Sequence, residues 1–280
     1  MAETVRRAFV CGHPVAHSRS PLIHNYWLRQ LGLSGAYERI DVPPEGFPAF
    51  LRDFPRMGFV GGNVTLPHKE AAFCLACATD AAARQIGAVN TLWLENGNIH
   101  GANTDAPGFL ANLDDRAPQW RDAKAATVLG AGGAARAILY ALKESGIENI
   151  RIVNRTPTRA MELVQGFAPG PSAHPWESLP PLLADTDLLV NTTSLGMGGE
   201  GRSDFDLAAM PRHAVVADIV YVPLETPLLR VARLHGLATV DGLGMLLHQA
   251  VPGFTRWFGR KPEVTEELRE LVIADLEAGK

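Results

Sequence analysis

The chain has 280 residues, of which 46% are apolar and 20% charged, and its formal net charge is −4 at pH 7. This length exceeds that of a typical single domain, so two domains with separate cores are expected. A small net charge without blocks of like charge argues against nucleic acid or an anionic membrane surface as a main partner, and favours a small soluble ligand.

The N-terminal stretch carries Arg6 and Arg7, but its apolar run covers only residues 8–11, which is too short for a signal peptide. No apolar stretch approaches the length needed to span a membrane. We therefore expect a soluble, cytoplasmic protein, and residues 8–11 predict a buried first strand.

A polar loop with Ser18 and Ser20 follows, and Pro21 comes directly after Ser20. Serine before proline is typical of a helix start, with Ser20 as N-cap and Pro21 at the first helical position. Apolar residues at helical spacing continue the pattern to residue 31. Capping thus competes with ligand binding as the role of Ser20, whereas Ser18 has no comparable structural role in the pattern.

Residues 37–42 predict a strand, residues 45–54 a helix, and residues 58–65 a strand that ends in the polar side chains of Asn63 and Thr65. The next helix is expected to begin near Lys69. A cation is unfavourable at a helix N-terminus because of the helix dipole, so a functional role of Lys69 is favoured over one in solubility.

The three cysteines, Cys11, Cys74 and Cys77, are an odd number in a chain without a secretion signal, so free thiols are expected. Cys74 and Cys77 form a CxxC pattern inside an Ala-rich helical stretch, without a second pair for zinc. They are predicted to be buried, reduced thiols with no redox or metal function. His13 and His17 are four residues apart, but Pro14 would interrupt a helix that placed both on one face, so no metal site is expected there either.

Residues 87–94 and 98–100 flank the sequence Glu-Asn-Gly, which predicts a β-hairpin. Asp105 follows this hairpin, and a purely structural role for it would be to cap a helix that reaches residue 113. From residue 124 strands and helices alternate, which predicts right-handed βαβ units on a parallel sheet. Helical patterns at 242–258 and 263–276 are expected to pack back on the first domain or to act as a hinge.

A glycine-rich turn at residues 130–134 follows a short apolar strand and precedes a helical pattern. Gly130 suits the tight turn, Gly132 lets the backbone approach a pyrophosphate, and Ala135 permits close helix packing. Bare amide groups and the helix dipole would then face the phosphates. An ordinary tight turn is the alternative, and the strand at residues 149–153, where a ribose reader belongs, favours the dinucleotide site.

That strand leads to Asn154, where a site for NAD would usually carry an acidic residue. Arg155, Thr156 and Arg159 follow. Guanidinium groups can engage a phosphate through forked, charge-assisted hydrogen bonds, so this segment predicts a preference for NADP over NAD.

The order and spacing of eight motifs along nearly the whole chain closely resemble the shikimate dehydrogenase family. The motifs are His17-Ser18-Arg19-Ser20-Pro21, Asn63-Val64-Thr65-Leu66-Pro67-His68-Lys69, Gly87-Ala88-Val89-Asn90-Thr91, Asn103-Thr104-Asp105, Gly130-Ala131-Gly132-Gly133-Ala134, Asn154-Arg155-Thr156 with Arg159, Asn191-Thr192-Thr193, and Asp241-Gly242-Leu243-Gly244-Met245 with Gln249.

The resemblance implies an α/β fold of two domains, with the active site in the cleft between them. Residues 1–104 plus 241–280 would form the substrate-binding and catalytic domain, and residues 105–240 a Rossmann-type NADP domain with a doubly wound parallel sheet. It also implies the NADPH-dependent, reversible reduction of 3-dehydroshikimate to shikimate, in the chorismate pathway to aromatic amino acids.

The resemblance further implies the residue roles. Lys69 and Asp105 would form the catalytic pair. The residues that would hold the substrate are Ser18, Ser20, Asn63, Thr65, Asn90, Tyr221 and Gln249. Those that would line the cofactor are Gly130, Ala131, Gly132, Gly133, Ala134, Asn154, Arg155, Thr156, Arg159, Thr192, Ile219 and Gly242.

Elementary chemistry agrees with these roles, because hydride delivery to a ketone leaves an alkoxide that needs a nearby proton donor. A lysine can be that donor, and a neighbouring carboxylate keeps such a lysine charged and oriented. No metal is required. The alternatives are a quinate/shikimate dehydrogenase and a catalytically inactive NADP-binding sensor, although a sensor would be expected to have lost Lys69 or Asp105. The oligomeric state stays open, with a homodimer among the candidates.

Overall fold

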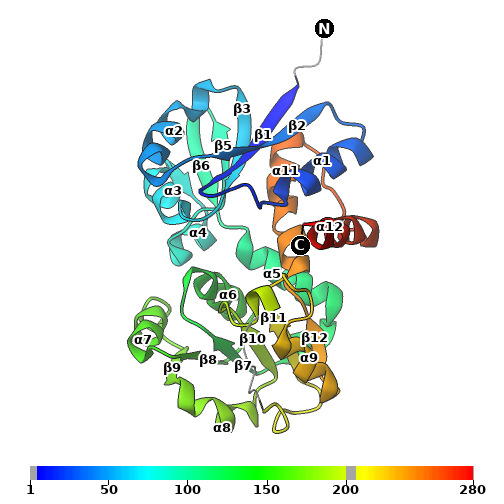
Figure 1. Cartoon of the computed structure of the whole chain (residues 1–280). Coiled ribbons are helices and arrows are strands. Elements are labelled where there is room, and N and C mark those ends of the chain that lie inside the picture. The colour runs from blue at the N-terminus through cyan, green and yellow to red at the C-terminus, as the bar shows by residue number, and fades with distance from the viewer. Residues whose placement is uncertain (1–4, 200–205, 280) are drawn as a thin grey trace. The chain divides into compact units, whose positions relative to one another are not determined.

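The computed structural model describes residues 5–199 and 206–279 and divides into two compact units (Figure 1). Unit 1 comprises Met1–Thr104 and Gln249–Lys280, and unit 2 comprises Asp105–His248. Among the described residues, every helix is too short or too polar to cross a membrane. Each unit is built on its own six-stranded sheet.

The sheet of unit 1 is mixed, with the strand order β2-β1-β3-β5-β6-β4. Its strands are β1 (Arg6–Gly12), β2 (Gly35–Asp41), β3 (Phe59–Val64), β4 (Ala78–Thr79), β5 (Thr91–Glu95) and β6 (Asn98–Ala102). β1 runs parallel to β2 and β3, whereas β5 is antiparallel to β3 and β6. The predicted hairpin is confirmed, since Asn96 and Gly97 both have positive φ angles, as a two-residue hairpin turn requires.

The described part of unit 1 has six α-helices, which are α1 (Ser20–Gln30), α2 (Phe47–Asp53), α3 (Lys69–Leu75), α4 (Ala81–Ile86), α11 (Ala250–Phe258) and α12 (Glu266–Ala278). Short 3₁₀ helices at Pro44–Gly46 and Phe54–Arg56 flank α2, so the predicted helix at 45–54 is shorter than expected. Phe9 and Cys11 pack with α2 and α3, and strand alternation turns Ala8 and Val10 to the opposite face.

The second segment of unit 1 is anchored by Trp257 of α11. Its side chain is 1% exposed, and its indole Nε1 donates a hydrogen bond of 2.9 Å to the carbonyl oxygen of Leu92. A Cβ atom at Gly61 would lie 2.0 Å from the same nitrogen, so only glycine fits below the indole. The N-terminal strands therefore depend on a helix that comes from the far end of the chain.

The sheet of unit 2 is entirely parallel, with the order β12-β11-β10-β7-β8-β9. Its strands are β7 (Ala125–Leu129), β8 (Asn149–Asn154), β9 (Ser172–Pro175), β10 (Leu188–Asn191), β11 (Val215–Asp218) and β12 (Ala238–Val240). This is the strand order of the doubly wound dinucleotide-binding fold, so the predicted fold class is confirmed.

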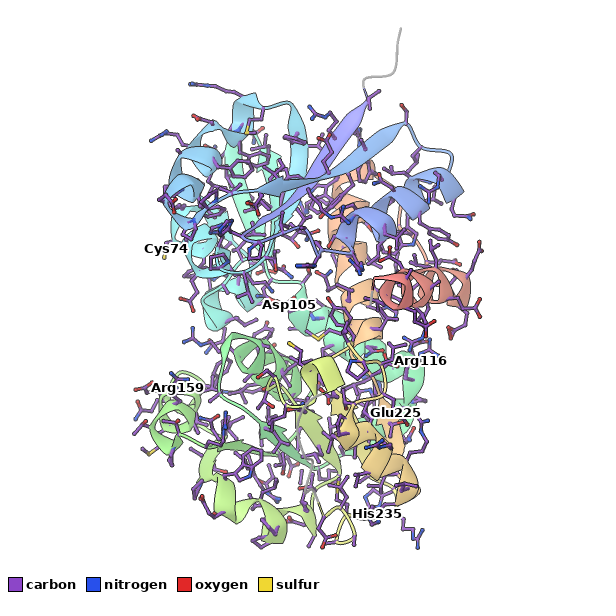
Figure 2. All side chains as sticks on the ribbon, viewed as in Figure 1. Cys74, Asp105, Arg116, Arg159, Glu225 and His235 are labelled. Atoms are coloured by element: carbon purple, nitrogen blue, oxygen red, sulfur yellow. The ribbon has the colours of Figure 1, made fainter. Side chains whose placement is uncertain are left out.

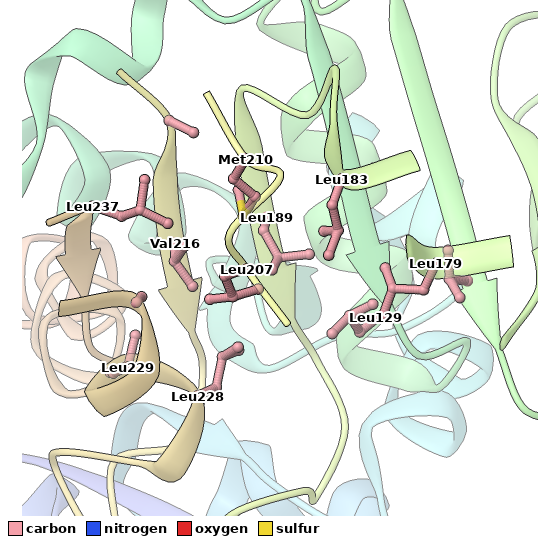
Figure 3. Close-up of a cluster of buried hydrophobic side chains, with 13 residues drawn as sticks. Leu129, Leu179, Leu183, Leu189, Leu207, Met210, Val216, Leu228, Leu229 and Leu237 are labelled. Carbon is pink, nitrogen blue, oxygen red and sulfur yellow. The ribbon is translucent and has the colours of Figure 1, made fainter. Parts of the chain in front are cut away.

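The α-helices of unit 2 are α5 (Asp105–Arg116), α6 (Gly133–Glu144), α7 (Pro157–Gln165), α8 (Leu179–Leu183), α9 (Pro227–Leu234) and α10 (Leu243–His248). Among the described residues of unit 2, 3₁₀ helices lie at Pro118–Asp122, Trp176–Ser178 and Met197–Gly199. Leucines from the strands meet leucines of α8 and α9 in one buried cluster, which includes Leu129, Leu189 and Leu228 (Figure 3).

The helical pattern predicted over residues 242–258 is two helices that belong to different units. α10 packs against α5, where a Cβ atom at Gly244 would collide with Asn112, and the side-chain amide of Asn112 donates to the carbonyl oxygen of Asp241 at 2.7 Å. The division between the units therefore falls between His248 and Gln249 rather than at residue 241.

Candidate functional site

The loop before α1 reverses the expected roles of its two serines. α1 begins at Ser20, its N-cap is Arg19, and no side chain caps the helix. The hydroxyl oxygen of Ser18 instead accepts a hydrogen bond of 3.3 Å from the backbone N–H of Ser20. The prediction that Ser20 is the N-cap was wrong. Ser18 has the structural contact that the sequence pattern did not reveal, whereas the side chain of the buried Ser20 hydrogen-bonds to Tyr37.

Two charged side chains of β2 hold the same loop. Arg39 donates two hydrogen bonds, of 2.8 and 3.0 Å, to the carbonyl oxygen of Ser18. Asp41 accepts one of 3.1 Å from the backbone N–H of Val15. These contacts fix the backbone that presents Ser18 and Ser20.

The side-chain amide of Asn63, near the end of β3, forms hydrogen bonds through both its nitrogen and its oxygen. Its amide nitrogen donates to the carbonyl oxygen of Asn90 at 3.0 Å and to the hydroxyl of Thr91 at 3.1 Å. Its amide oxygen accepts from the hydroxyl of Tyr37 at 2.5 Å. The orientation of this amide is thereby determined by its neighbours.

In Asn63 it is the amide nitrogen that makes most of the side-chain hydrogen bonds, whereas in Asn90 it is the amide oxygen. Its amide oxygen accepts from the backbone N–H of Thr104 at 2.9 Å and from the hydroxyls of Thr91 and Thr104. Its amide nitrogen donates to the side-chain oxygen of Gln249 at 3.4 Å. The structure thus brings together Asn63, Asn90 and Gln249, three of the residues predicted to hold the substrate, although Gln249 lies 159 positions from Asn90.

Lys69 is the first residue of α3, as predicted, and is half-buried. Its carbonyl oxygen accepts from the backbone N–H of Val89, next to Asn90, at 2.9 Å. The preceding His68 is buried, and its imidazole stacks on Phe47 and hydrogen-bonds through Nε2 to the carbonyl oxygen of Val42 at 2.6 Å. These contacts tie the start of α3 to the sheet. The predicted partner Asp105 begins α5 in unit 2, immediately after Thr104 of the Asn90 network.

Two further residues predicted to hold the substrate, Thr65 and Tyr221, belong to different units. Thr65 lies just after β3, where its carbonyl oxygen accepts from the backbone N–H of His68 at 3.0 Å. Tyr221 lies in unit 2, beyond the end of β11. The residues of unit 1 that are predicted to hold the substrate are therefore Ser18, Ser20, Asn63, Thr65, Asn90 and Gln249.

The glycine-rich turn has the geometry that a diphosphate needs. Gly130 has a φ of +107°, and a Cβ atom there would lie 2.7 Å from the hydroxyl oxygen of Thr192. At Gly132 and Gly133 a Cβ atom would meet nothing within 4 Å, so the backbone borders open space. α6 begins at Gly133, and no side chain caps it. Its uncapped N–H groups and helix dipole can receive an anion.

The segment after β8 carries no carboxylate. Asn154 is half-buried and donates from its amide to the carbonyl oxygen of Thr156 at 2.9 Å, while Arg155 and Arg159 are exposed. Arg159 is labelled in Figure 2. Exposed guanidinium groups beside the turn suit a phosphorylated ribose. The donor set of unit 2 therefore fits a dinucleotide with an additional phosphate.

Three residues assigned to the cofactor also have structural roles. The hydroxyl of Thr192 donates to the carbonyl oxygen of Leu129 at 2.7 Å and so joins the ends of β10 and β7. A Cβ atom at Gly242 would lie 2.2 Å from the carbonyl oxygen of Ile219. Close backbone packing is therefore sufficient to explain the glycine at position 242.

Sequence reasoning missed a buried polar cluster under the same strand ends. Asp218 accepts hydrogen bonds from the amide of Asn191 at 2.9 Å, the backbone N–H of Val220 at 3.0 Å and the hydroxyl of Thr226 at 2.7 Å. Burial raises the pKa of Asp218 to about 6 despite these donors. Tyr37 was missed as well, because a tyrosine in a predicted strand carries no distinguishing signal.

The prediction that Cys74 and Cys77 are buried was wrong, since both thiols are free and exposed. Cys74 is labelled in Figure 2. α3 ends at Leu75, and Ala72 is its only described buried residue. An Ala-rich stretch does not indicate a face, because alanine fits both surface and core. Cys11 is buried and free, and burial raises its pKa to about 12.

Family models match three segments of the chain. They are the shikimate dehydrogenase substrate binding domain at residues 10–92, shikimate / quinate 5-dehydrogenase at residues 113–220, and the shikimate 5'-dehydrogenase C-terminal domain at residues 242–272. The chain is also similar, at 63% identity over the full length of both proteins, to a shikimate dehydrogenase (NADP(+)) from Chelativorans sp. (strain BNC1).

Two solved structures are similar throughout. Shikimate 5-dehydrogenase from Thermus thermophilus, in complex with NADP(H) and shikimate, is 39% identical with a TM-score of 0.86, covering 97% of this chain and 100% of that one. Quinate dehydrogenase from Corynebacterium glutamicum, in complex with NAD, is 30% identical with a TM-score of 0.87, covering 96% and 99%.

Proposed function

The chain belongs to the shikimate dehydrogenase family, and from this membership we propose that it catalyses the reversible, NADPH-dependent reduction of 3-dehydroshikimate to shikimate. This reaction serves chorismate and aromatic amino-acid biosynthesis. The observation that carries the proposal is the network beside the start of the Lys69 helix, in which the amide nitrogen of Asn63 donates to the protein and the amide oxygen of Asn90 accepts from it. Such a set suits a polyhydroxylated ring.

We propose that unit 1 supplies most of the substrate-binding residues and unit 2 the cofactor site. The residues that would hold the carboxylate and hydroxyls of the substrate are Ser18, Ser20, Asn63, Thr65, Asn90 and Gln249 of unit 1 and Tyr221 of unit 2. In unit 2 the open backbone at Gly132 and Gly133 would receive the diphosphate, and Arg155 and Arg159 the 2′-phosphate.

NADPH held by unit 2 would supply the hydride for reduction of a carbonyl carbon, and the carbonyl oxygen of the substrate would then need a proton. We assign that proton transfer to the ammonium group of Lys69, which donates in reduction and accepts in oxidation. Asp105 would stabilise and orient this ammonium through its carboxylate. The backbone hydrogen bond from Val89 to Lys69 supports this role, because it holds the backbone of Lys69 against the segment that carries Asn90.

Turnover tests the proposal directly. Protein mixed with shikimate and NADP should form reduced nicotinamide, followed by its absorbance, with a kcat/KM higher than for NAD. Absence of turnover with every pair of substrate and cofactor would support the NADP-binding sensor instead. Quinate should be tested in parallel, because the chain is also similar to a quinate dehydrogenase. A kcat/KM for quinate equal to that for shikimate would favour a dual-specificity enzyme.

We also propose a cytoplasmic location, where a small acid and NADPH are both available. Cell fractionation followed by the same absorbance assay would test it, since activity confined to the membrane fraction would contradict it.

A further inference from the structure

The Tyr37 side chain lies in the interior of unit 1, with 3% of its surface exposed. It projects from β2 opposite Ala8 of β1, while Asn63 of β3 lies opposite Val10 of the same strand. The three strands are neighbours in the order β2-β1-β3, so the phenol must reach across β1 to bond to Asn63. The small side chain of Ala8 leaves room for the ring to do so.

Aromatic side chains hold the ring in place. The imidazole of His24 stacks on Tyr37 with ring centroids 4.0 Å apart and planes inclined by 6°, and the indole of Trp257 approaches to 5.9 Å. His24 is fully buried, and desolvation lowers its pKa to about 3, so the imidazole is neutral. These ring contacts fix the position of the Tyr37 hydroxyl, in addition to its hydrogen-bond distance from Asn63.

The hydrogen-bond polarity of this pair follows from the acceptors around Asn63. A backbone carbonyl can only accept, so the carbonyl of Asn90 requires an N–H of Asn63, and Thr91 receives the second one. The group facing Tyr37 is therefore the amide oxygen of Asn63, and the phenol must donate. Burial raises the pKa of Tyr37 well above its usual value, which keeps the donated proton on the phenol.

In the part of the chain that the structure describes, both hydrogens of the Asn63 amide are donated, and Tyr37 takes one of the two lone pairs of its oxygen. The buried His24 stacks on Tyr37 nearby, but neither of its ring nitrogens has hydrogen-bond geometry to a described partner, so the second lone pair of Asn63 is left for a ligand. A ligand group at Asn63 must then donate a hydrogen bond. A hydroxyl can do this, whereas an ionised carboxylate would face a lone pair and be disfavoured.

We propose that Tyr37 is a positioning residue, which holds Asn63 as a dedicated acceptor for one ring hydroxyl of the substrate. The inference rests on the proposed function, because it takes Asn63 to contact the substrate. It adds that the specificity of this contact is set from outside the site, by a side chain of another strand.

The test compares Tyr37→Phe, which keeps the ring and its stacking, with Tyr26→Phe, a matched control. Tyr26 is also buried, at 7% exposure, and lies on α1 of the same unit. Tyr37→Phe should raise KM for shikimate about 2- to 12-fold, the weight of one hydrogen bond, with KM for NADP unchanged. Tyr26→Phe should change neither constant. Thermal unfolding of both variants verifies that they are folded.

Substrate analogues distinguish positioning from a general effect on structure. Analogues of shikimate that each lack one of the two hydroxyls not oxidised in the reaction are compared as ligands. For one analogue, wild type and Tyr37→Phe should bind equally, because the hydroxyl that Asn63 accepts from is missing. For the other, the loss seen with shikimate should persist. An equal loss for both analogues, or no loss with shikimate, would overturn the inference.

Asn63→Ala separates failure of this inference from failure of the proposed function. If Asn63→Ala leaves KM for shikimate unchanged, Asn63 does not contact the substrate and the proposed site is wrong. If Asn63→Ala raises KM but Tyr37→Phe does not, only the positioning role is wrong. If Asn63→Ala and Tyr37→Phe each raise KM for shikimate, the double variant should have the same KM as Asn63→Ala alone, because Tyr37 acts through Asn63.

Discussion

Lys69 combines a functional prediction with a structural one at the scale of a single residue. It begins α3, where the helix dipole disfavours a cation, and its backbone is held by Val89. Lys69→Ala should lower kcat by about 10²–10⁴-fold with little change in KM, since the proton donor is lost while the binding groups remain. Steady-state kinetics with Lys261→Ala, an exposed lysine of the same unit, provide the control. A near-normal kcat in Lys69→Ala would remove this residue from the mechanism.

The cofactor preference depends on Arg155 and its neighbours. Arg155→Ala should weaken NADP binding roughly ten- to a hundredfold, because a charge-assisted hydrogen bond contributes about 1.5–3 kcal/mol. NAD binding should barely change, since NAD carries no 2′-phosphate. The measurement is kcat/KM for both cofactors, with Arg230→Ala, an exposed arginine on α9, as the control. An equal loss for both cofactors would mean that Arg155 does not recognise the phosphate.

At the scale of elements, Asp218 links β10, β11 and α9 through its bonds to Asn191 and Thr226. Its folded-state pKa of about 6 exceeds the usual 3.8, so the folded protein binds the extra proton between these values. The contribution of Asp218 to the free energy of unfolding is therefore largest below about pH 4 and is lost as the pH rises through about 6.

Asp218→Asn should remove this dependence while keeping the acceptor for Asn191 and Val220, which both bond to the same carboxylate oxygen. The free energy of unfolding of the variant, relative to wild type, should increase by up to about 3 kcal/mol between about pH 4 and pH 7. Denaturant unfolding of both proteins across that range provides the measurement. A difference that does not vary with pH would contradict the assigned titration.

The sequence predicted elements well wherever one local conformation was required. Asn96 and Gly97 allow few structures besides a tight hairpin, and Gly130 with the following helix pattern predicts the phosphate turn. Contacts between distant elements could not be predicted. The link between Tyr37 and Asn63 exists only because β1 lies between their strands, and the exposure of Cys74 depends on where α3 ends.

The whole molecule has one continuous unit and one discontinuous unit. Unit 2 is a single stretch, whereas unit 1 needs α11, whose Trp257 is buried against Gly61 and Leu92. Residues 105–248 produced alone should therefore fold and bind NADPH. Residues 1–104 alone should not fold, because their sheet lacks the helix that covers it. Circular dichroism and NADPH fluorescence titration measure the two outcomes.

A rearranged chain provides the control for this division. Asn90 hydrogen-bonds to both Thr104 and Gln249, so the ends of the two unit 1 segments lie close together. Joining residue 104 to residue 249 through a short glycine-rich linker should therefore restore a cooperatively folding unit 1. Cooperative folding of residues 1–104 without the second segment would contradict the dependence on α11.

The discontinuity of unit 1 has a consequence for how the protein is made. On the ribosome, the nascent strands β1 to β6 emerge first but lack α11, so they cannot complete their core. At about 5–20 residues per second, the intervening unit takes roughly 7–30 s to synthesise. The later-made unit 2 is thus free to fold first, while the earlier-made segment must wait with apolar surface uncovered. We therefore expect the nascent chain to be most prone to aggregation during this interval.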